Sequence, residues 1–217
     1  FAPSSWCSPT WRVVAGRPRV AVVVRMEALW VSTGVVALAE IGDKTQLLAF
    51  LLAARFKKPA PIIAGILLAT LLNHGLAGAL GAWIVAHVSP DILRWALGLS
   101  FIAMAVWTLI PDRVEEDEVS IAQRFGVFGA TLVTFFLAEM GDKTQVATVA
   151  MAVHYAAPLM VVVGTTFGML IADVPAVFVG DRLSQRLPMR WVRGAAAAVF
   201  AALGGMTLLG AGSALGV

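Results

Sequence analysis

Leu-Ala-Glu-Ile-Gly-Asp-Lys-Thr-Gln, residues 38–46, recurs 99 residues later as Leu-Ala-Glu-Met-Gly-Asp-Lys-Thr-Gln, residues 137–145. Eight of the nine positions are identical, and each copy carries two carboxylates and a lysine within a long apolar run. An ionisable side chain at membrane depth is costly, so it is a functional-site hypothesis by default. Two matched sets therefore indicate a site built from both copies.

The composition places the chain among membrane proteins. Of its 217 residues 59% are hydrophobic and 13% are charged, whereas a soluble domain carries about 25% charged residues. No basic block interleaved with aromatic residues appears, so nucleic-acid binding has no support. The single cysteine, Cys7, excludes an internal disulfide, and no Cys/His cluster predicts a zinc or iron–sulfur centre. We therefore expect a lipid bilayer around the chain and no resident cofactor.

Six apolar segments are expected to cross the membrane. Each is long enough to span ~30 Å of hydrocarbon at about 1.5 Å per residue. Only helices and closed barrels span lipid, and continuous apolar runs without alternation exclude a barrel. The predicted fold is an all-α integral membrane protein with six transmembrane helices, at about residues 28–54, 61–86, 92–110, 125–153, 157–180 and 191–215.

The two halves repeat beyond the nonapeptide, since Gly65 and Gly164, and also Gly81 and Gly180, keep the offset of 99. Three spans per repeat is an odd number, so the second copy inserts upside down. This arrangement is typical of secondary transporters that bind substrate near the midplane. The expected organisation is a disordered or non-native extension (1–25), a first repeat (26–111), an acidic cytoplasmic linker (112–124) and a second repeat (125–217).

The distribution of Lys and Arg predicts the orientation. The loops after the first, third and fifth segments hold nine such residues, and those after the second and fourth hold only Arg94. Because short cytoplasmic loops are enriched in Lys and Arg, the acidic linker should be cytoplasmic and both termini outside. The four arginines before Met26 oppose this assignment if the extension is native.

Both motifs are expected to lie near the bilayer midplane and to face each other. On a regular helix, Glu40, Asp43 and Lys44 would share an arc of about 100°. Thr45 would then point away from Glu40, while Gln46 would flank Asp43. The second copy, with Lys143, Thr144 and Gln145, is placed in the same way.

The charge count favours a cation as the substrate. The six charged residues sum to −2, which one divalent cation would neutralise, although two Na⁺ or two protons satisfy the same count. Carboxylate, amide and hydroxyl oxygens suit Mg²⁺, Ca²⁺ or Mn²⁺ better than softer metals. Without the cation, crowded carboxylates in low dielectric would take up protons, so cation/proton exchange follows. The proposed ligands are Glu40, Asp43, Glu139 and Asp142.

The motif glycines have two possible structural roles. Gly42 and Gly141 could let two helices approach closely, or they could let the backbone open and offer carbonyl oxygens to a cation.

Other functions use the same residues differently. Glu40 and Lys44 could form an i,i+4 pair that merely stabilises a bundle, although a structural pair does not need two near-identical copies. An exchanger of other small solutes could share this architecture. An intramembrane enzyme is disfavoured, because no nucleophile, HExxH or lipid-phosphate motif accompanies the carboxylates.

Three further polar residues lie inside apolar segments. Asp173 precedes Val174-Pro175 in the fifth segment, and His74, beside Asn73, holds the equivalent place in the second. They are candidates for a supporting role behind the cation ligands or for a proton relay. A kink associated with Pro175 or an ordinary buried polar group explains them equally well.

The doubled Glu-x-Gly-Asp-Lys-Thr motif, in a six-helix chain with an acidic central loop, resembles the transmembrane-protein-165 family of cation/proton antiporters. The resemblance covers about residues 27–215. It implies transport of Mn²⁺ or Ca²⁺ against protons, with the motif residues as the cation site. Small prokaryotic members without a large extra domain look like manganese exporters, which implies a prokaryotic inner membrane. The Arg- and Trp-rich start departs from the family pattern.

Overall fold

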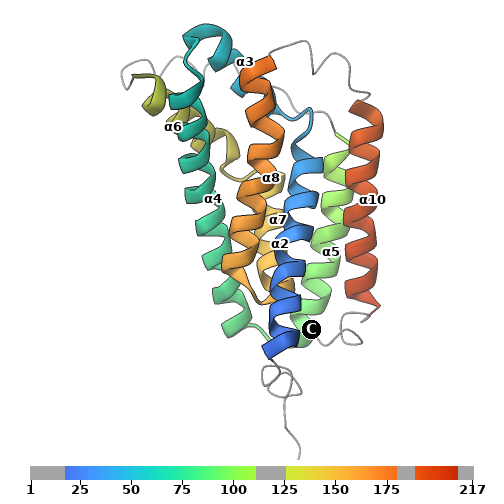
Figure 1. Ribbon diagram of the computed structural model, residues 1–217. Coiled ribbons are helices and arrows are strands. Elements are labelled where there is room, and N and C mark those ends of the chain that lie inside the picture. Colours follow the sequence, from blue (N-terminus) through green and yellow to red (C-terminus); the bar gives the residue numbers. More distant parts are fainter. Residues whose placement is uncertain (1–17, 111–125, 180–188, 210–217) are drawn as a thin grey trace, which may run out of the picture.

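The computed structural model describes residues 18–110, 126–179 and 189–209, and in these ranges every regular element is an α-helix (Figure 1). The expectations for residues 1–17 and for the acidic linker fall outside them. The helices are α2 (Pro18–Glu40), α3 (Lys44–Phe56), α4 (Pro59–His87), α5 (Pro90–Thr108), α6 (Gly126–Glu139), α7 (Lys143–Tyr155), α8 (Pro158–Val179) and α10 (Met189–Leu208).

The repeated motif breaks two of the expected segments. The first segment becomes α2 and α3, and the fourth becomes α6 and α7. At the breaks Gly42 has φ 81° and Gly141 has φ 78°, a region that glycine enters without the steric cost of a Cβ. The prediction of a regular helix through the motif was wrong, because an apolar run does not reveal that its glycines turn the chain. The alternative in which the backbone opens at these glycines is confirmed.

The two halves also end their helices alike. The residues after α3 and α7, Lys57 with φ 53° and Ala156 with φ 47°, both adopt a left-handed conformation. Pro59 and Pro158 then start α4 and α8. Proline suits the first turn of a helix because that N–H has no partner within the helix. The offset of 99 residues therefore applies to helix ends as well as to the motif.

Within the described ranges, four helices are long and apolar enough to cross a membrane: Val22–Glu40 within α2, Pro59–His87, Pro90–Thr108 and Pro158–Phe178. Two shorter apolar helices are Gly126–Glu139 and Gly194–Leu208. The expectation of a helical membrane protein is therefore supported. Helix α2 starts at Pro18, so it reaches back into the stretch that was expected to be an extension.

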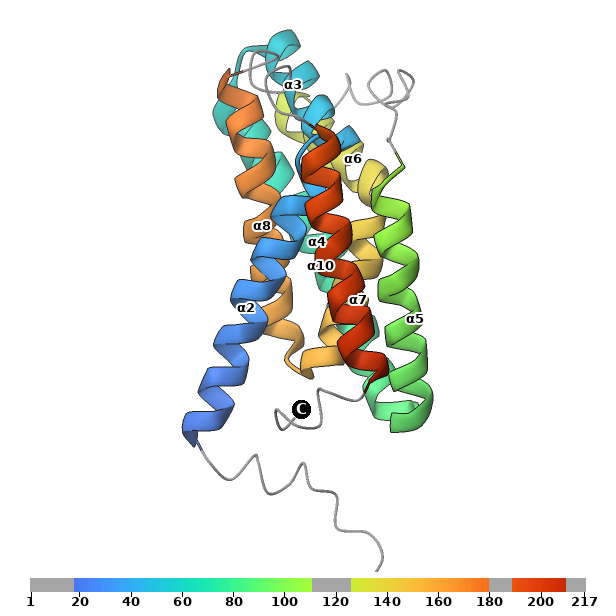
Figure 2. The ribbon, with the colours of Figure 1, turned by 90° about the vertical axis from the view of Figure 1, so that its right-hand side faces the viewer.

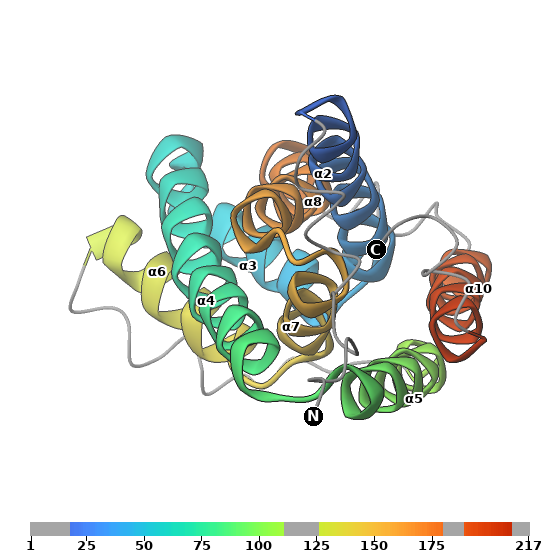
Figure 3. The ribbon, with the colours of Figure 1, turned by 90° about the horizontal axis from the view of Figure 1, so that it is seen from below.

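Helices from different halves pack against each other. Seen from below in Figure 3, α3 and α7 lie between the pair α2–α8 on one side and the pair α4–α6 on the other, while α5 and α10 pack together at the edge. Small residues allow close approach: a Cβ on Gly168 of α8 would come within 2.6 Å of the Thr33 carbonyl oxygen of α2. Equally, a Cβ on Gly65 of α4 would lie 2.7 Å from Thr131 Cβ of α6.

The motifs lie where two apolar clusters meet. Ala39, which precedes Glu40, belongs to a cluster with Phe101 and Phe200. Ala138, which precedes Glu139, belongs to a second cluster that includes Leu48 and Phe135. The charged residues therefore sit inside the bundle and not on its surface.

Candidate cation site

Four carboxylates stand at the two helix breaks. Glu40 and Glu139 end α2 and α6, while Asp43 and Asp142 are the N-cap residues of α3 and α7. All four are buried, with exposed fractions of 0–5%. One carboxylate oxygen from each of Glu40, Glu139 and Asp142 lies within 4.8 Å of the other two. The structure thus brings together three of the four predicted ligands, from both copies of the motif.

A threonine of the same motif holds each glutamate. Thr45 Oγ1 donates a hydrogen bond to Glu40 Oε2 over 2.6 Å, and Thr144 Oγ1 donates to Glu139 Oε2 over 2.8 Å. The expectation that Thr45 points away from Glu40 was wrong, because it assumed that the helix continues past Glu40. The turn at Gly42 brings the hydroxyl back to the carboxylate.

The remaining oxygens of this cluster have no hydrogen-bond partner among the described residues: Glu40 Oε1, Glu139 Oε1 and Asp142 Oδ2. Buried polar atoms are nearly always satisfied, so such exceptions point to a bound water or ion. Carboxylate oxygens are the ligands that hard divalent cations prefer. Each of the three residues that approach one another therefore also presents a buried oxygen without a hydrogen-bond partner among the described residues.

Each lysine pairs with the aspartate of the other copy. Lys143 Nζ lies 2.7 Å from Asp43 Oδ1, and both side chains are at most 4% exposed. Lys44 Nζ lies 3.7 Å from Asp142 Oδ1, and its side chain is 24% exposed. An N-cap aspartate usually accepts from a backbone amide of the first turn, but neither aspartate makes that bond. Sequence spacing did not predict these crossed pairs, because they join residues 100 and 98 positions apart.

The motif glutamines support the breaks. Gln46 Oε1 accepts from the Gly42 N–H over 2.9 Å, and Gln145 Oε1 accepts from the Gly141 N–H over 2.8 Å. This resembles the back-reaching half of a capping box. Gln46 Nε2 also donates to the Ala172 carbonyl of α8 over 2.9 Å. Gln46 was expected to flank Asp43, and no sequence signal marked Ala172 as its partner.

The three further polar residues are all buried. Asn73 Nδ2 donates to the Phe136 carbonyl of α6 over 3.0 Å, so this side chain joins α4 to α6. Neither ring nitrogen of His74 and neither carboxylate oxygen of Asp173 has a hydrogen-bond partner among the described residues. Neither residue belongs to the group of three clustered carboxylates.

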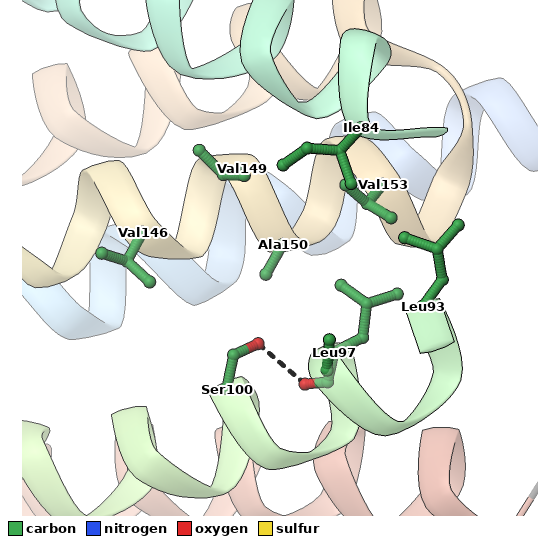
Figure 4. A pocket seen from close by; sticks show the side chains of 9 residues that line it. Ile84, Leu93, Leu97, Ser100, Val146, Val149, Ala150 and Val153 are labelled. Carbon is green, nitrogen blue, oxygen red and sulfur yellow. Dashed lines mark hydrogen bonds between the residues drawn. The ribbon is translucent and has the colours of Figure 1, made fainter. Parts of the chain in front are cut away.

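An apolar cavity of about 180 Å³ lies apart from these residues, between α4, α5 and α7 (Figure 4). Ile84, Leu97 and Val149 are among its lining residues, and Ser100 is the polar one. The Ser100 hydroxyl donates to the Leu97 carbonyl over 2.8 Å, so it is already satisfied. The cavity therefore offers no ligands for a cation.

Comparison with known proteins points to one family. The model of the family described as "Divalent cation/proton antiporter GDT1" matches residues 28–116 and 127–214, one match in each half. A Vibrio cholerae protein named "Putative manganese exporter" is 52% identical over 176 residues, covering 81% of this chain and 87% of that protein. The GDT1-like protein 3 of Arabidopsis thaliana is 28% identical over 85% of this chain and 68% of its own. No solved structure matches.

Proposed function

Because the chain belongs to the GDT1 family of divalent cation/proton antiporters, we propose that it exports Mn²⁺ in exchange for protons through a site between its two motifs. The name of the Vibrio cholerae relative supports manganese as the substrate. The antiporter resemblance inferred from the doubled motif is confirmed by the family match.

One observation carries the site assignment. Glu40 comes from the first motif and Glu139 and Asp142 from the second, yet their oxygens converge within 4.8 Å, and each residue has a buried oxygen without a hydrogen-bond partner in the described part of the chain. Three converging carboxylates would repel one another strongly in a low-dielectric interior. A divalent cation relieves this repulsion and satisfies the oxygens. A purely structural network would instead leave costly unmade interactions.

The crossed ion pairs give the exchange a physical basis. With four motif carboxylates and two lysines, the formal charge of the site is −2, which one divalent cation cancels. A cation that engages Asp142 competes with Lys44, whose contact of 3.7 Å is the weaker of the two pairs. When the cation leaves, protons can restore neutrality, since unpaired buried charges are expensive. We propose that this alternation couples Mn²⁺ export to proton entry.

We infer that the two halves form inverted three-helix repeats. Following the colours in Figures 1 and 2, α2 runs upward, whereas α6 and α7 run downward. In the repeat, α6 corresponds to α2 and α8 corresponds to α4. The contact between α2 and α8 therefore has its counterpart in the contact between α6 and α4, and both contacts are present. We propose that the site lies near the midplane of a prokaryotic inner membrane, with the acidic linker cytoplasmic and both termini outside.

Calcium is the second candidate substrate, because an all-oxygen site also suits Ca²⁺. Reconstituted vesicles with a set pH gradient distinguish the two ions, since each can be offered alone and in competition. The proposal predicts that Mn²⁺ moves faster than Ca²⁺ at equal concentration. Faster transport of Ca²⁺ would assign the chain to calcium instead.

Everted membrane vesicles test the site directly. Adding Mn²⁺ should collapse an established pH gradient in vesicles with the native chain, and Asp43→Asn or Asp142→Asn should abolish this response, because each removes a charge from the site. The matched control is Asp91→Asn, which changes an exposed aspartate at the start of α5 and should leave transport unchanged. Native rates in both motif variants, at equal membrane abundance, would refute the site.

A further inference from the structure

Asp173 of α8 is a buried carboxylate that the two motifs do not explain. Its exposed fraction is 0%, and neither of its oxygens has a hydrogen-bond partner among the described residues. Burying a polar group without partners costs free energy, and a buried charge costs more. A side chain in this position therefore requires compensation by something that the neighbouring protein atoms do not supply.

The first motif lies next to this carboxylate. The Gln46 side chain donates to the carbonyl of Ala172, which directly precedes Asp173, over 2.9 Å. Asp173 lies within electrostatic reach of Asp43, and also of Glu40 and Glu139. Three acidic side chains of the two motifs thus share one electrostatic environment with Asp173.

The backbone near Asp173 is less constrained than that of a regular helix. Pro175 lies inside α8, and proline removes the amide that would otherwise bond the carbonyl four residues earlier, which is that of Ile171. Asp173 sits between these two residues. Its side chain can therefore adjust toward an ion with little loss of helical hydrogen bonding.

We propose that Asp173 is a fifth carboxylate ligand of the transported divalent cation, acting beside Asp43 at one end of an elongated site. The Glu40, Glu139 and Asp142 cluster forms the other end. This inference rests on the proposed function. It makes the site asymmetric, because the counterpart of Asp173 in α4 is His74, and imidazole suits softer metals better than it suits Mn²⁺ or Ca²⁺.

Mn²⁺ binding to purified variants tests the proposal. The concentration of Mn²⁺ that gives half of the maximal rise in thermal midpoint should increase by about tenfold or more in Asp173→Asn, as expected for loss of an interaction that supports a metal. The same concentration for half-maximal transport in proteoliposomes should rise in parallel. Asp91→Asn, which changes an exposed aspartate at the start of α5, is the control and should stay within about twofold of the native chain. Native values for Asp173→Asn would overturn the proposal.

A second variant tests the proposal if Asp173→Asn does not fold. Asp173→Glu keeps the charge but moves the carboxylate by one methylene, so it should change the ratio of Mn²⁺ to Ca²⁺ half-saturating concentrations. An unchanged ratio together with unchanged affinities would overturn the proposal. If the native chain binds no Mn²⁺ at all, the proposed manganese function fails instead, and the same comparison with Ca²⁺ decides the role of Asp173.

Discussion

At the scale of single residues, the threonine–glutamate bonds set the ligand geometry. Each hydroxyl holds one glutamate oxygen, while the other oxygen has no hydrogen-bond partner among the described residues. An oriented ligand loses less entropy on binding than a mobile one, and partners of metal ligands typically contribute 10–100-fold in affinity. We therefore expect the threonines to support cation binding without touching the ion.

Thr144→Val should raise the Mn²⁺ concentration for half-maximal transport by about 10-fold to 100-fold, because Glu139 then loses its hydroxyl donor. Thr134→Val is the matched control. Thr134 is equally buried, but its hydroxyl donates to the Ala130 carbonyl within α6 over 2.8 Å. Initial rates over a range of Mn²⁺ concentrations in proteoliposomes measure the difference. Equal effects of the two substitutions would assign Thr144 a packing role only.

The two lysines should differ in their contribution to stability. Lys143 and Asp43 form a buried pair at 2.7 Å, whereas Lys44 is partly exposed and 3.7 Å from Asp142. Removing one partner of a buried pair typically costs about 3–5 kcal/mol, and the loss of a longer contact from a lysine that water still partly solvates is expected to cost less. Lys143→Met should therefore lower the thermal midpoint in detergent, without metal, far more than Lys44→Met does. Similar decreases in the thermal midpoint for both variants would mean that the two ion pairs contribute equally to stability.

At the scale of helices, the breaks at Gly42 and Gly141 place the ends of α2 and α6 inside the bundle. These ends are held in position by close packing, since α8 contacts α2 and α4 contacts α6. A Cβ at Gly168 would lie 2.6 Å from the Thr33 carbonyl oxygen and 2.9 Å from the Ala37 nitrogen. Both are backbone atoms of α2, one turn or two before Glu40.

Gly168→Ala should therefore push α2 from α8, lowering both the thermal midpoint and the transport rate. Gly75→Ala is the control, because a Cβ there meets nothing within 4 Å. In a helix interior this exchange should be neutral or should stabilise the protein by up to about 1 kcal/mol. Thermal unfolding in detergent and Mn²⁺ transport of both variants check the prediction. Native behaviour of Gly168→Ala would show that the helices tolerate separation at this point.

At the scale of the whole molecule, the sequence predicted what depends on composition and repetition. The membrane class, the burial of Glu40 and Glu139, and the pairing of both motifs in one place follow from charged residues repeated within apolar runs. The helix breaks were only one of two alternatives, because a central glycine is compatible with both a continuous and an interrupted helix. The crossed lysine–aspartate pairs and the Gln46–Ala172 bond were missed because spacing along one helix carries no information about contacts across the bundle.

The central claim is that the two motifs build one cation site and not two. The direct test is the number of Mn²⁺ ions bound per purified chain, measured by equilibrium dialysis for the native protein, Glu40→Gln and Glu139→Gln. Since the oxygens of both residues belong to one cluster, we predict one ion per chain at this site in the native protein and loss of that ion in either variant. Two ions in the native protein, with one kept in each single variant, would contradict the account.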